Sequence, residues 1–329
     1  MGKKGKTNHN RNSKLLLFLF LSATAVLPAC NKTTNPKPTI DPAAHAAEIQ
    51  QWQRDRLASL TKEDGWLTLI GLFWLNEGEN KFGSGPGNSI VLPKDRAPAN
   101  AGSLWLEKGK VRLVARPEAK IYVKGSAAGD IKSTGEPVTA AELAPDTDEA
   151  GPTILQLGSL RINVIKRGER VGLRVKDVES RTRREFKGLE YYPIDPKWRI
   201  EARVEPYQPP KMIPITNVLS MTEDEPSPGA LAFEVDGKTY RIDPILEQGE
   251  TDWFVMIADE TTAKETYGAG RYLYVKPPDA SGKVVIDFNQ AYSPPCAFTN
   301  YATCPLPPRQ NHLPFRIDAG EKKYAGTVH

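Results

Sequence analysis

The sequence predicts a mainly β protein, with sandwich- or barrel-like antiparallel sheets and a short N-terminal helix. Three observations predict this fold class. Most apolar segments are short and are separated by Gly, Pro, Asp and Asn, as strands are separated by turns. The 329 residues include 26 Gly and 28 Pro, which suits many tight turns and little helix. Closely spaced short strands favour sandwich or barrel layers over βαβ units.

The single expected helix begins the folded part of the chain. Asp41-Pro42 supplies an N-cap residue followed by a proline at the first helical position. Ile49, Trp52 and Leu60 then recur near helical spacing, until Asp64-Gly65 ends the pattern. We therefore expect a helix that starts at Pro42 and stops before Asp64-Gly65.

The expected strands follow that helix. They are short apolar segments bounded by turn residues. The expected strands are Trp66–Leu75, Ser89–Leu92, Ser103–Leu106, Val111–Ala115, Lys120–Val123, Leu160–Lys166, Val171–Val175, Ala230–Val235, Phe254–Ala258, Arg271–Val275 and Lys283–Phe288.

Prolines interrupt any regular pattern between residues 205 and 229, which predicts a boundary there. We therefore expect residues 45–205 to hold the helix and a first β subdomain. Residues 206–329 are expected to form a second β subdomain with a Pro-rich loop that contains two cysteines.

The first 29 residues have the pattern of a secretory signal peptide. Basic residues precede an apolar stretch that runs from Leu15 to Val26, and Leu27-Pro28-Ala29-Cys30 closes it. That stretch is too short to span a bilayer as a helix, but it suits a signal peptide. A small residue before a cysteine at the cleavage point is typical of bacterial lipoproteins. We therefore expect a signal peptide at residues 1–29 and a lipid on Cys30; the alternative is an ordinary signal peptide with a chance cysteine.

Residues 30–44 are expected to be a lipidated tether, because they are polar and Pro-rich. The lipid predicts a location in the bacterial cell envelope, with the membrane as a partner. Asn31 follows the cysteine, which resembles the class sorted to the outer membrane, facing the periplasm, if the cell has two membranes.

Charge argues against a nucleic-acid partner. The chain has 44 Lys and Arg and 40 Asp and Glu, but five of the basic residues and no acidic residue lie in the expected signal peptide. The mature chain is therefore close to neutral, whereas nucleic-acid binding requires a basic surface.

The four histidines limit the classes of enzyme that the sequence allows. His9 lies in the signal peptide, His45 at the tether and His329 at the C-terminus, so only His312 is expected inside the folded domain. The sequence has no Gly-x-Ser-x-Gly, His-x-x-His or His-Glu-x-x-His motif. We therefore predict neither a Ser-His-Asp hydrolase of the familiar kind nor a histidine zinc site, and we predict no metal and no cofactor.

Cys296 and Cys304 are the two cysteines that remain after Cys30. They lie eight positions apart in a Pro-rich loop and can meet if the chain doubles back. An oxidising envelope favours a disulfide between them. Thiolate ligation of a metal, with Asp287 or His312 added, stays open as the alternative, although the pair lacks Cys-x-x-Cys spacing.

A candidate binding site lies in the C-terminal part of the chain. The turn sequence Pro277–Gly282 separates two expected strands and predicts a hairpin that brings Arg271 close to Asp287. The Gly-rich segment Thr266–Gly270 would expose backbone N–H groups beside the guanidinium, an arrangement that holds a carboxylate or phosphate. The alternative is a buried Arg271–Asp287 ion pair, with the glycines serving the bend.

Two classes of function follow from this cleft. The first is a binding protein for a small anionic or carbohydrate ligand, and the second is a hydrolytic or metal-dependent enzyme that uses the same cleft. The expected ligand-binding residues are Tyr267, Gly268, Gly270, Arg271, Asn289 and Asn311. The candidate catalytic residues are Asp287, Glu321 and Arg271.

Two blocks of sequence resemble a known family. The first block is Gly65–Leu75, and the second comprises Thr266–Leu273, Asp287–Asn289, Pro294–Cys296, Cys304–Pro308 and Ala319–Lys322. From about Trp52 to Tyr324 the chain is similar to the uncharacterised family called domain of unknown function 1684. That family has no established activity, so the resemblance implies membership and assigns no site residue.

A weaker resemblance concerns the first expected strands. Phe82-Gly83-Ser84 and Asn88–Pro93 are similar to the opening strands of forkhead-associated β-sandwiches, which bind phosphothreonine. Ser84 stands where those domains have an arginine, and no Ser-x-x-His follows. The resemblance therefore implies at most a shared sandwich and not phosphopeptide binding.

Overall fold

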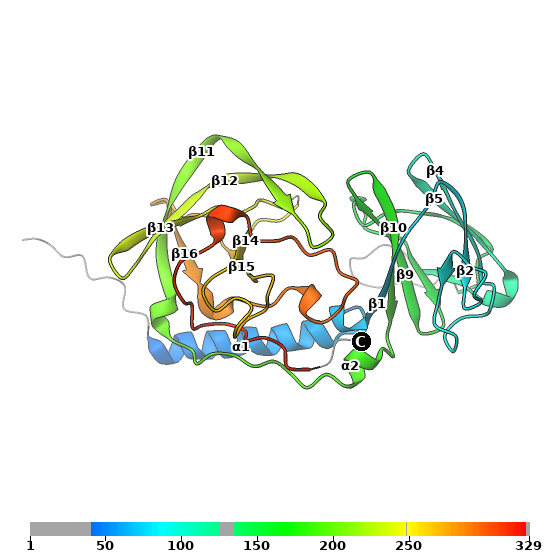
Figure 1. Cartoon of the computed structure of the whole chain (residues 1–329), viewed down its shortest axis with the longest axis horizontal. Helices are drawn as coiled ribbons and strands as arrows, with labels where there is room; N and C mark the ends of the chain where they lie inside the picture. Colours follow the sequence, from blue (N-terminus) through cyan, green and yellow to red (C-terminus); the bar gives the residue numbers. More distant parts are fainter. Residues whose placement is uncertain (1–40, 125–134, 248, 327–329) are drawn as a thin grey trace, which may run out of the picture. The chain divides into compact units, whose positions relative to one another are not determined.

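A computed structural model describes residues 41–124, 135–247 and 249–326 of the chain (Figure 1). These residues form mainly antiparallel sheets, in which only the short β3 (Ile90–Val91) pairs in parallel, with one helix of 20 residues at the N-terminal end, and they belong to a single structural unit. The predicted mainly β fold is confirmed. The expected signal peptide, Cys30 and the tether up to residue 40 lie outside the described residues.

Helix α1 (Pro42–Thr61) begins at the cap that the sequence predicts. The Asp41 side chain accepts a hydrogen bond from the Ala43 amide, and a proline occupies the first helical position. Residues 42–44 therefore belong to the helix and not to the expected tether. Within the described ranges, no helix has both the length and the apolar character needed to cross a membrane.

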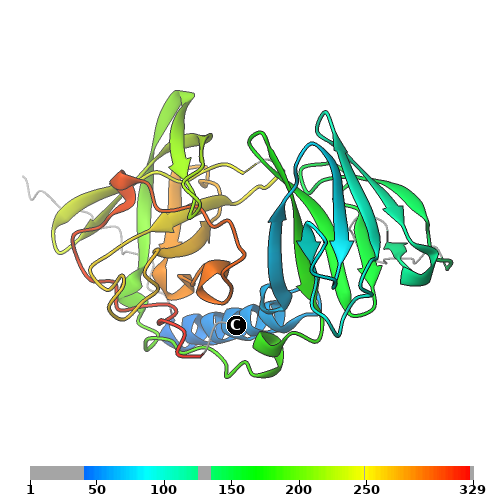
Figure 2. The same ribbon diagram turned by 45° about the vertical axis from the view of Figure 1, so that its right-hand side comes forward.

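Two five-stranded sheets share one hydrophobic core and form a β-sandwich (Figure 2). In spatial order, the first sheet consists of β1 (Leu69–Trp74), β10 (Arg170–Asp177), β9 (Leu160–Arg167), β8 (Ile154–Leu157) and β6 (Tyr122–Lys124). The second consists of β3 (Ile90–Val91), β2 (Gly78–Gly83), β4 (Gly102–Glu107), β5 (Lys110–Ala115) and β7 (Ala140–Leu143). Buried and exposed positions alternate regularly along β5, because successive side chains point to opposite faces of a sheet.

A four-stranded sheet and a two-stranded ribbon build a second core. In spatial order, the sheet consists of β13 (Lys238–Ile242), β12 (Thr222–Val235), β11 (Arg199–Thr216) and β16 (Lys283–Asp287). The ribbon consists of β14 (Trp253–Ile257) and β15 (Arg271–Val275). All five residues of β14 are buried, which places the ribbon inside this core.

Short helical turns connect the strands. They are η1 (Trp66–Thr68), η2 (Pro117–Ala119), α2 (Arg181–Arg184), η3 (Pro196–Trp198), η4 (Phe288–Gln290), η5 (Pro295–Ala297) and η6 (Arg309–Asn311).

The expected boundary at residues 205 and 206 falls inside β11, which is one strand that pairs with β12. Prolines are tolerated there because the register of this pair shifts between Pro206 and Lys211, and an interrupted ladder does not need every backbone N–H. The two cores divide earlier in the chain. The sandwich core ends at Val175, and the second core begins at Trp198.

The expected hairpin of residues 271–275 and 283–288 is wrong. β15 pairs with β14, and β16 pairs with β11, so that Arg271 faces Ile257 and Asp287 faces Arg199 in register. The turn between the two strands does form, with Asp279 accepting hydrogen bonds from local backbone amides. A local turn does not decide strand pairing here, because each strand finds a longer-range partner in the core.

Candidate functional site

Arg271 is completely buried; its two terminal nitrogens bond protein groups, and its Nε has no hydrogen-bond partner among the described residues. It pairs with Asp259 at 3.2 Å and donates to the carbonyl oxygens of Ile317 and Ala319. Burial lowers the pKa of Arg271, whereas Asp259 raises it. The expected Arg271–Asp287 pair is therefore wrong, and the alternative of a structural ion pair holds for Arg271 with a different partner.

Asp287 instead joins helix α1 to the second core. His45 Nε2 lies 2.6 Å from Asp287 Oδ2, and only 1% of the His45 side chain and 11% of the Asp287 side chain are exposed. His45 is thus part of the fold, because the helix starts early enough to place it one turn before the buried Ile49. The expectation that only His312 lies inside the folded domain is wrong, because His45 is buried in the fold as well, whereas His312 lies at the surface.

Glu321 also holds helix α1. Its Oε1 accepts a hydrogen bond from Arg56 Nε at 2.9 Å, and its Oε2 accepts one from the Ser293 amide at 2.8 Å. Arg56 additionally donates to the Ser293 carbonyl oxygen. Glu321 is completely buried, so its carboxylate stabilises the contact between helix α1 and the C-terminal part of the chain.

The two expected asparagines cross-link loops. Asn289 exchanges two hydrogen bonds with the backbone of Asp195, and Asn311 bonds the backbone of Asp243 and Met256. Tyr267 is similar, because its hydroxyl donates to the Cys296 carbonyl oxygen at 2.9 Å. The structure therefore does not bring the expected site residues together in one cleft.

The Gly-rich turn lines a smaller cavity of about 450 Å³. Gly268 and Gly270 lie at its wall with the acidic Asp259 and Glu260 and with His312. No lysine or arginine is among its described lining residues, and Asp259 already binds Arg271. This cavity is thus poorly suited to the anionic group that the sequence led us to expect there.

A larger cleft of about 550 Å³, called the main cleft below, lies among β9, β10, β12, β14, β15 and the disulfide loop. Its volume is in the range of small-molecule sites. Basic residues from β9 and β10, acidic residues from β12 and the loop after β13, and aromatic residues line separate parts of it. We call these parts the cationic wall (Lys166, Arg167, Arg174), the acidic wall (Glu223, Glu225, Glu247) and the aromatic floor (Phe254, Tyr272, Tyr274, Tyr292).

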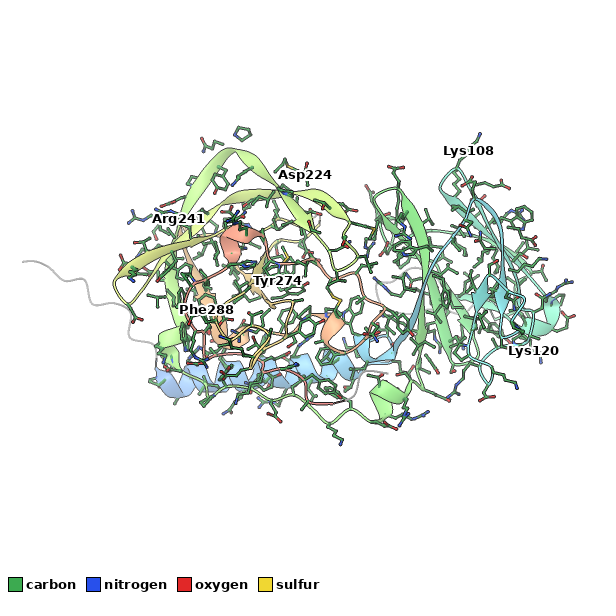
Figure 3. The ribbon with its side chains drawn as sticks, viewed as in Figure 1. Lys108, Lys120, Asp224, Arg241, Tyr274 and Phe288 are labelled. Carbon is green, nitrogen blue, oxygen red and sulfur yellow. A yellow bond between two sulfur atoms is a disulfide. The ribbon has the colours of Figure 1, made fainter. Side chains whose placement is uncertain are left out.

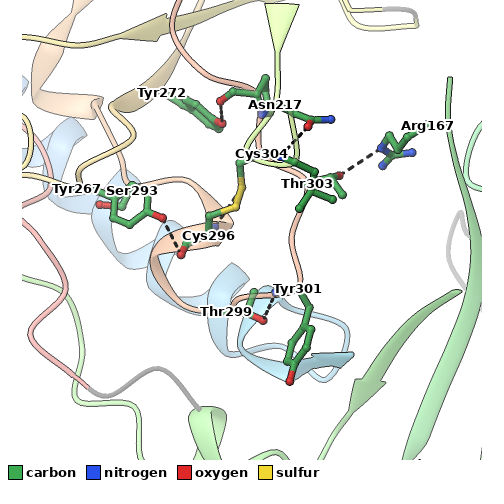
Figure 4. Close-up of a disulfide and its surroundings, with 12 residues drawn as sticks. Arg167, Asn217, Tyr267, Tyr272, Ser293, Cys296, Thr299, Tyr301, Thr303 and Cys304 are labelled. Carbon is green, nitrogen blue, oxygen red and sulfur yellow. Dashed lines mark hydrogen bonds between the residues drawn. A yellow bond between two sulfur atoms is a disulfide. The ribbon is translucent and has the colours of Figure 1, made fainter. Parts of the chain in front are cut away.

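Arg174 is the unusual member of the cationic wall. Its neighbour Arg167 pairs with Asp146 at 2.9 Å and donates to Thr303 (Figure 4), but no described acidic side chain pairs with Arg174. Arg174 Nε is buried without a hydrogen-bond partner, and its guanidinium lies 5.0 Å from the centre of the Trp66 ring. Burial, and then the charge of Arg167, lower the pKa of Arg174 to about 10, although the charge of Asp146, which pairs with Arg167, raises it in part. Arg174 is therefore a largely desolvated cation that stays charged at neutral pH.

The acidic wall is not neutralised by the cationic wall. Burial raises the pKa of Glu225, and the charges of Glu223 and Glu247 raise it further. Burial also raises the pKa of Glu247, which the hydrogen bond from the Tyr274 hydroxyl partly offsets. No lysine or arginine is among the groups that shift these two pKa values, so the walls keep their opposite charges apart.

The aromatic floor is a connected group of rings. The Phe254 ring centre lies 4.8 Å from that of Tyr272 and 5.2 Å from that of Tyr274 (labelled in Figure 3), and Tyr272 meets Tyr292 at 5.8 Å. Burial raises the pKa of Tyr292 to about 12, so its hydroxyl stays neutral at physiological pH. Tyr274 is 43% exposed and presents the most accessible ring.

Cys296 and Cys304 form a disulfide at the edge of the main cleft, as predicted (Figure 4). The bond holds the loop whose Pro305 carbonyl oxygen accepts the Tyr272 hydroxyl. Both sulfur atoms are used in this bond, so the alternative of thiolate ligation does not apply to the structure. Groups of three or more His, Cys, Asp or Glu placed to hold a metal do not occur among the described residues.

Sequence reasoning missed the residues of the main cleft. Arg174, Glu225 and Glu247 lie on strands and loops that are distant in sequence, and each looks like an ordinary polar residue of a strand or loop. The one local feature of the sequence that hints at this cleft is the pair Tyr272 and Tyr274, which stand at alternate positions of β15 and so lie on the same face of the strand. No motif spacing could have indicated that these residues meet.

The fold and the cleft define a mainly β protein with a sandwich and a second sheet region, and residues of both line a cleft of small-molecule size. Residues 184–322 match the family model described as Protein of unknown function (DUF1684), and through these residues the chain belongs to that family. The match begins after β10. The acidic wall and aromatic floor therefore lie within the matched region, whereas the cationic wall precedes it.

A solved structure is similar to part of the chain. It is the solution NMR structure of an uncharacterized protein from Haloarcula marismortui, with 32% sequence identity and a TM-score of 0.37. The similarity covers 44% of this chain and 81% of that one. No curated protein matches the chain.

Proposed function

We propose that this protein binds a small carbohydrate carrying an anionic group in its main cleft. The observation that carries the proposal is Arg174, a largely buried cation at the cleft with an unpaired Nε. Burying a cation without a partner is unfavourable. An anionic ligand group would supply both the opposite charge and the hydrogen-bond acceptor that the guanidinium lacks.

The other lining groups support a sugar as the rest of the ligand. The exposed ring of Tyr274 offers a surface on which the apolar face of a sugar ring can stack. The carboxylates of the acidic wall can accept hydrogen bonds from sugar hydroxyls. Aromatic rings combined with a few polar groups are the usual composition of small-molecule sites.

Isothermal titration with two sugars tests this proposal. N-acetylmuramic acid carries a carboxylate, and N-acetylglucosamine is the same ring without it. The purified protein is expected to bind N-acetylmuramic acid about tenfold more tightly, because a charge-assisted hydrogen bond is worth roughly 1.5 kcal/mol or more. Arg174→Met should remove this difference.

Arg170→Met is the matched control. Arg170 lies on the same strand, is exposed and stacks on Trp74 at 4.0 Å, and it does not line the main cleft. This variant should bind as the wild type does. Equal binding of the two sugars by the wild type, or no binding of either, would contradict the proposal.

We further propose that the protein is a lipoprotein of the bacterial cell envelope, anchored to the membrane through Cys30. The basic, apolar and small-residue order of the first 30 residues supports this location. In the producing cells, Cys30→Ala should release the protein from the membrane fraction and abolish labelling with a radioactive fatty acid. A Cys30→Ala protein that still sediments with membranes would overturn the anchor.

A hydrolytic enzyme is the second candidate, and the raised pKa values of Glu225 and Glu247 favour it. A carboxyl group with a raised pKa can act as a general acid near neutral pH. The catalytic candidates from the sequence do not support a hydrolytic enzyme, because their side chains bind other protein groups. These candidates are Asp287, Glu321 and Arg271. Release of 4-nitrophenol from 4-nitrophenyl glycosides by the wild type but not by Glu247→Gln would establish the activity; no release by the wild type would exclude it for these substrates.

A further inference from the structure

The main cleft has a second charged region that the anionic ligand group does not explain. Among the described residues, no lysine or arginine pairs with Glu223, Glu225 or Glu247, although all three line the cleft. Burial raises the pKa of both Glu225 and Glu247, and repulsion from the charges of Glu223 and Glu247 raises the pKa of Glu225 further. A ligand that placed only an anion and hydroxyl groups in the cleft would leave this repulsion in place.

The acidic residues of β12 lie side by side at the cleft. Glu223 and Glu225 share one face of the strand, because alternate residues of a strand point the same way, and both line the cleft. The next residue on that face, Ser227, is completely buried and is not among the described lining residues. The carboxylates are therefore the polar groups that this strand presents to the cleft.

The neighbouring aromatic rings favour a cation at the same place. Tyr274 donates its hydroxyl to Glu247, and its ring lies 5.2 Å from that of Phe254. Ring faces attract ammonium and guanidinium groups. The cleft already contains one such contact, since the Arg56 guanidinium lies 4.5 Å from the centre of the Tyr292 ring.

We infer that the acidic wall binds a protonated amine, so that the ligand is a zwitterionic amino sugar. Its anionic group lies at Arg174, and its ammonium group lies against Glu225, Glu247 and the ring of Tyr274. This inference rests on the proposed function for the anionic end of the ligand, and it adds the chemistry of the other end.

Four sugars separate the two ends. N-acetylglucosamine carries neither charge, N-acetylmuramic acid carries only the carboxylate, glucosamine carries only the ammonium, and muramic acid carries both. Titration calorimetry of the purified protein at neutral pH is expected to give the tightest binding for muramic acid. Its dissociation constant should be about tenfold below that of N-acetylmuramic acid.

Variants of the acidic wall test whether it causes the tighter binding of muramic acid. Glu247→Gln should reduce the tenfold preference for muramic acid to about twofold or less, while N-acetylmuramic acid binds as before. Glu225→Gln is a second variant with the same expected result, should one of the two fold poorly. Glu234→Gln is the control, because Glu234 is exposed on the same strand and does not line the cleft.

The outcomes distinguish this inference from the proposed function. If N-acetylmuramic acid binds through Arg174 but muramic acid binds no better, the amine site is wrong and the anion site stands. If glucosamine binds through Glu247 but the carboxylate adds nothing, the anion site is wrong and the amine site stands. If none of the four sugars binds, both are wrong.

Discussion

A buried arginine has opposite consequences at two positions of this protein. Arg271 has a carboxylate and two carbonyl oxygens as partners, and all of them belong to the protein. Arg174 also has an unpaired Nε, as Arg271 does, but among the described residues no carboxylate or carbonyl oxygen binds its guanidinium, and it lies at a cleft. Residue type and burial therefore do not distinguish a structural arginine from an arginine of a binding site. The two are distinguished by the groups that the guanidinium binds.

Arg271→Leu should destabilise the fold by about 3–5 kcal/mol, because it leaves Asp259 buried without its cation. Arg174→Met should be close to neutral or stabilising, since it removes an unpaired buried charge. Chemical unfolding of the two variants checks both expectations. A fully stable Arg271→Leu protein would mean that this ion pair does not hold the second core.

Glu247→Gln should change stability in a pH-dependent way. Burial raises the folded pKa of Glu247 above its unfolded value of 4.5, so its contribution to stability is fully present below 4.5 and is lost as the pH rises through the folded pKa. The glutamine side chain has no proton to lose and stays neutral as the pH rises. It should therefore match the wild type at about pH 4 and be more stable at about pH 7, as urea unfolding can measure. A variant that is less stable than the wild type at neutral pH would show that the Glu247 carboxylate is not destabilised by burial.

At the scale of elements, one hydrogen bond and one ion pair connect helix α1 to the second part of the chain. His45 hydrogen-bonds Asp287 near the start of the helix, and Arg56 pairs with Glu321 toward its C-terminal end. Arg56 also lines the main cleft over the Tyr292 ring. Helix α1 is therefore part of the wall of the proposed site.

Arg56→Leu should weaken the docking of α1 by about 2–4 kcal/mol, because Glu321 is completely buried and would lose its cation. Hydrogen exchange should then be faster along α1 than in the sandwich. Arg54→Leu is the control, since Arg54 is exposed and bonds only Gln51 of the same helix. Equal exchange in the two variants would contradict this role of Arg56.

Local signals explain why some elements could be predicted and others could not. The start of α1 follows from Asp41-Pro42, and β5 follows from regular alternation. β11 was not predicted because its prolines argue against a strand. The strand tolerates them because its pairing with β12 is interrupted by a bulge. The pairing of β15 with β14 was missed because strand pairing depends on the whole core and not on the turn that connects two strands.

At the scale of the whole molecule, the disulfide closes the loop that borders the main cleft. Replacing both Cys296 and Cys304 by serine should lower stability by about 2–3 kcal/mol, because the short loop gains freedom in the unfolded chain. Thermal unfolding of the double variant, and of the wild type with and without a reductant, checks this value. A reductant that leaves the midpoint of the wild type unchanged would contradict a stabilising bond.

The candidate site could be predicted from sequence only as a kind of chemistry. The expectation of an anionic or carbohydrate ligand remains a proposal, but the residues that carry it have changed. Arg271, Asp287 and Glu321 are charged residues of the C-terminal part whose pairing partners, Asp259, His45 and Arg56, come from other elements. Only the folded chain shows that these charges are already satisfied.

Chemical-shift mapping with N-acetylmuramic acid tests the main cleft most directly. In isotopically labelled protein, the ligand should shift the resonances of β10 around Arg174, of β12 around Glu225 and of the loop at Glu247. At the same ligand concentration, the Arg174→Met protein should show shifts no larger than those that N-acetylglucosamine produces in the wild type. Shifts confined to the smaller cavity at Gly268 and Gly270, with none at Arg174, would contradict the proposed site.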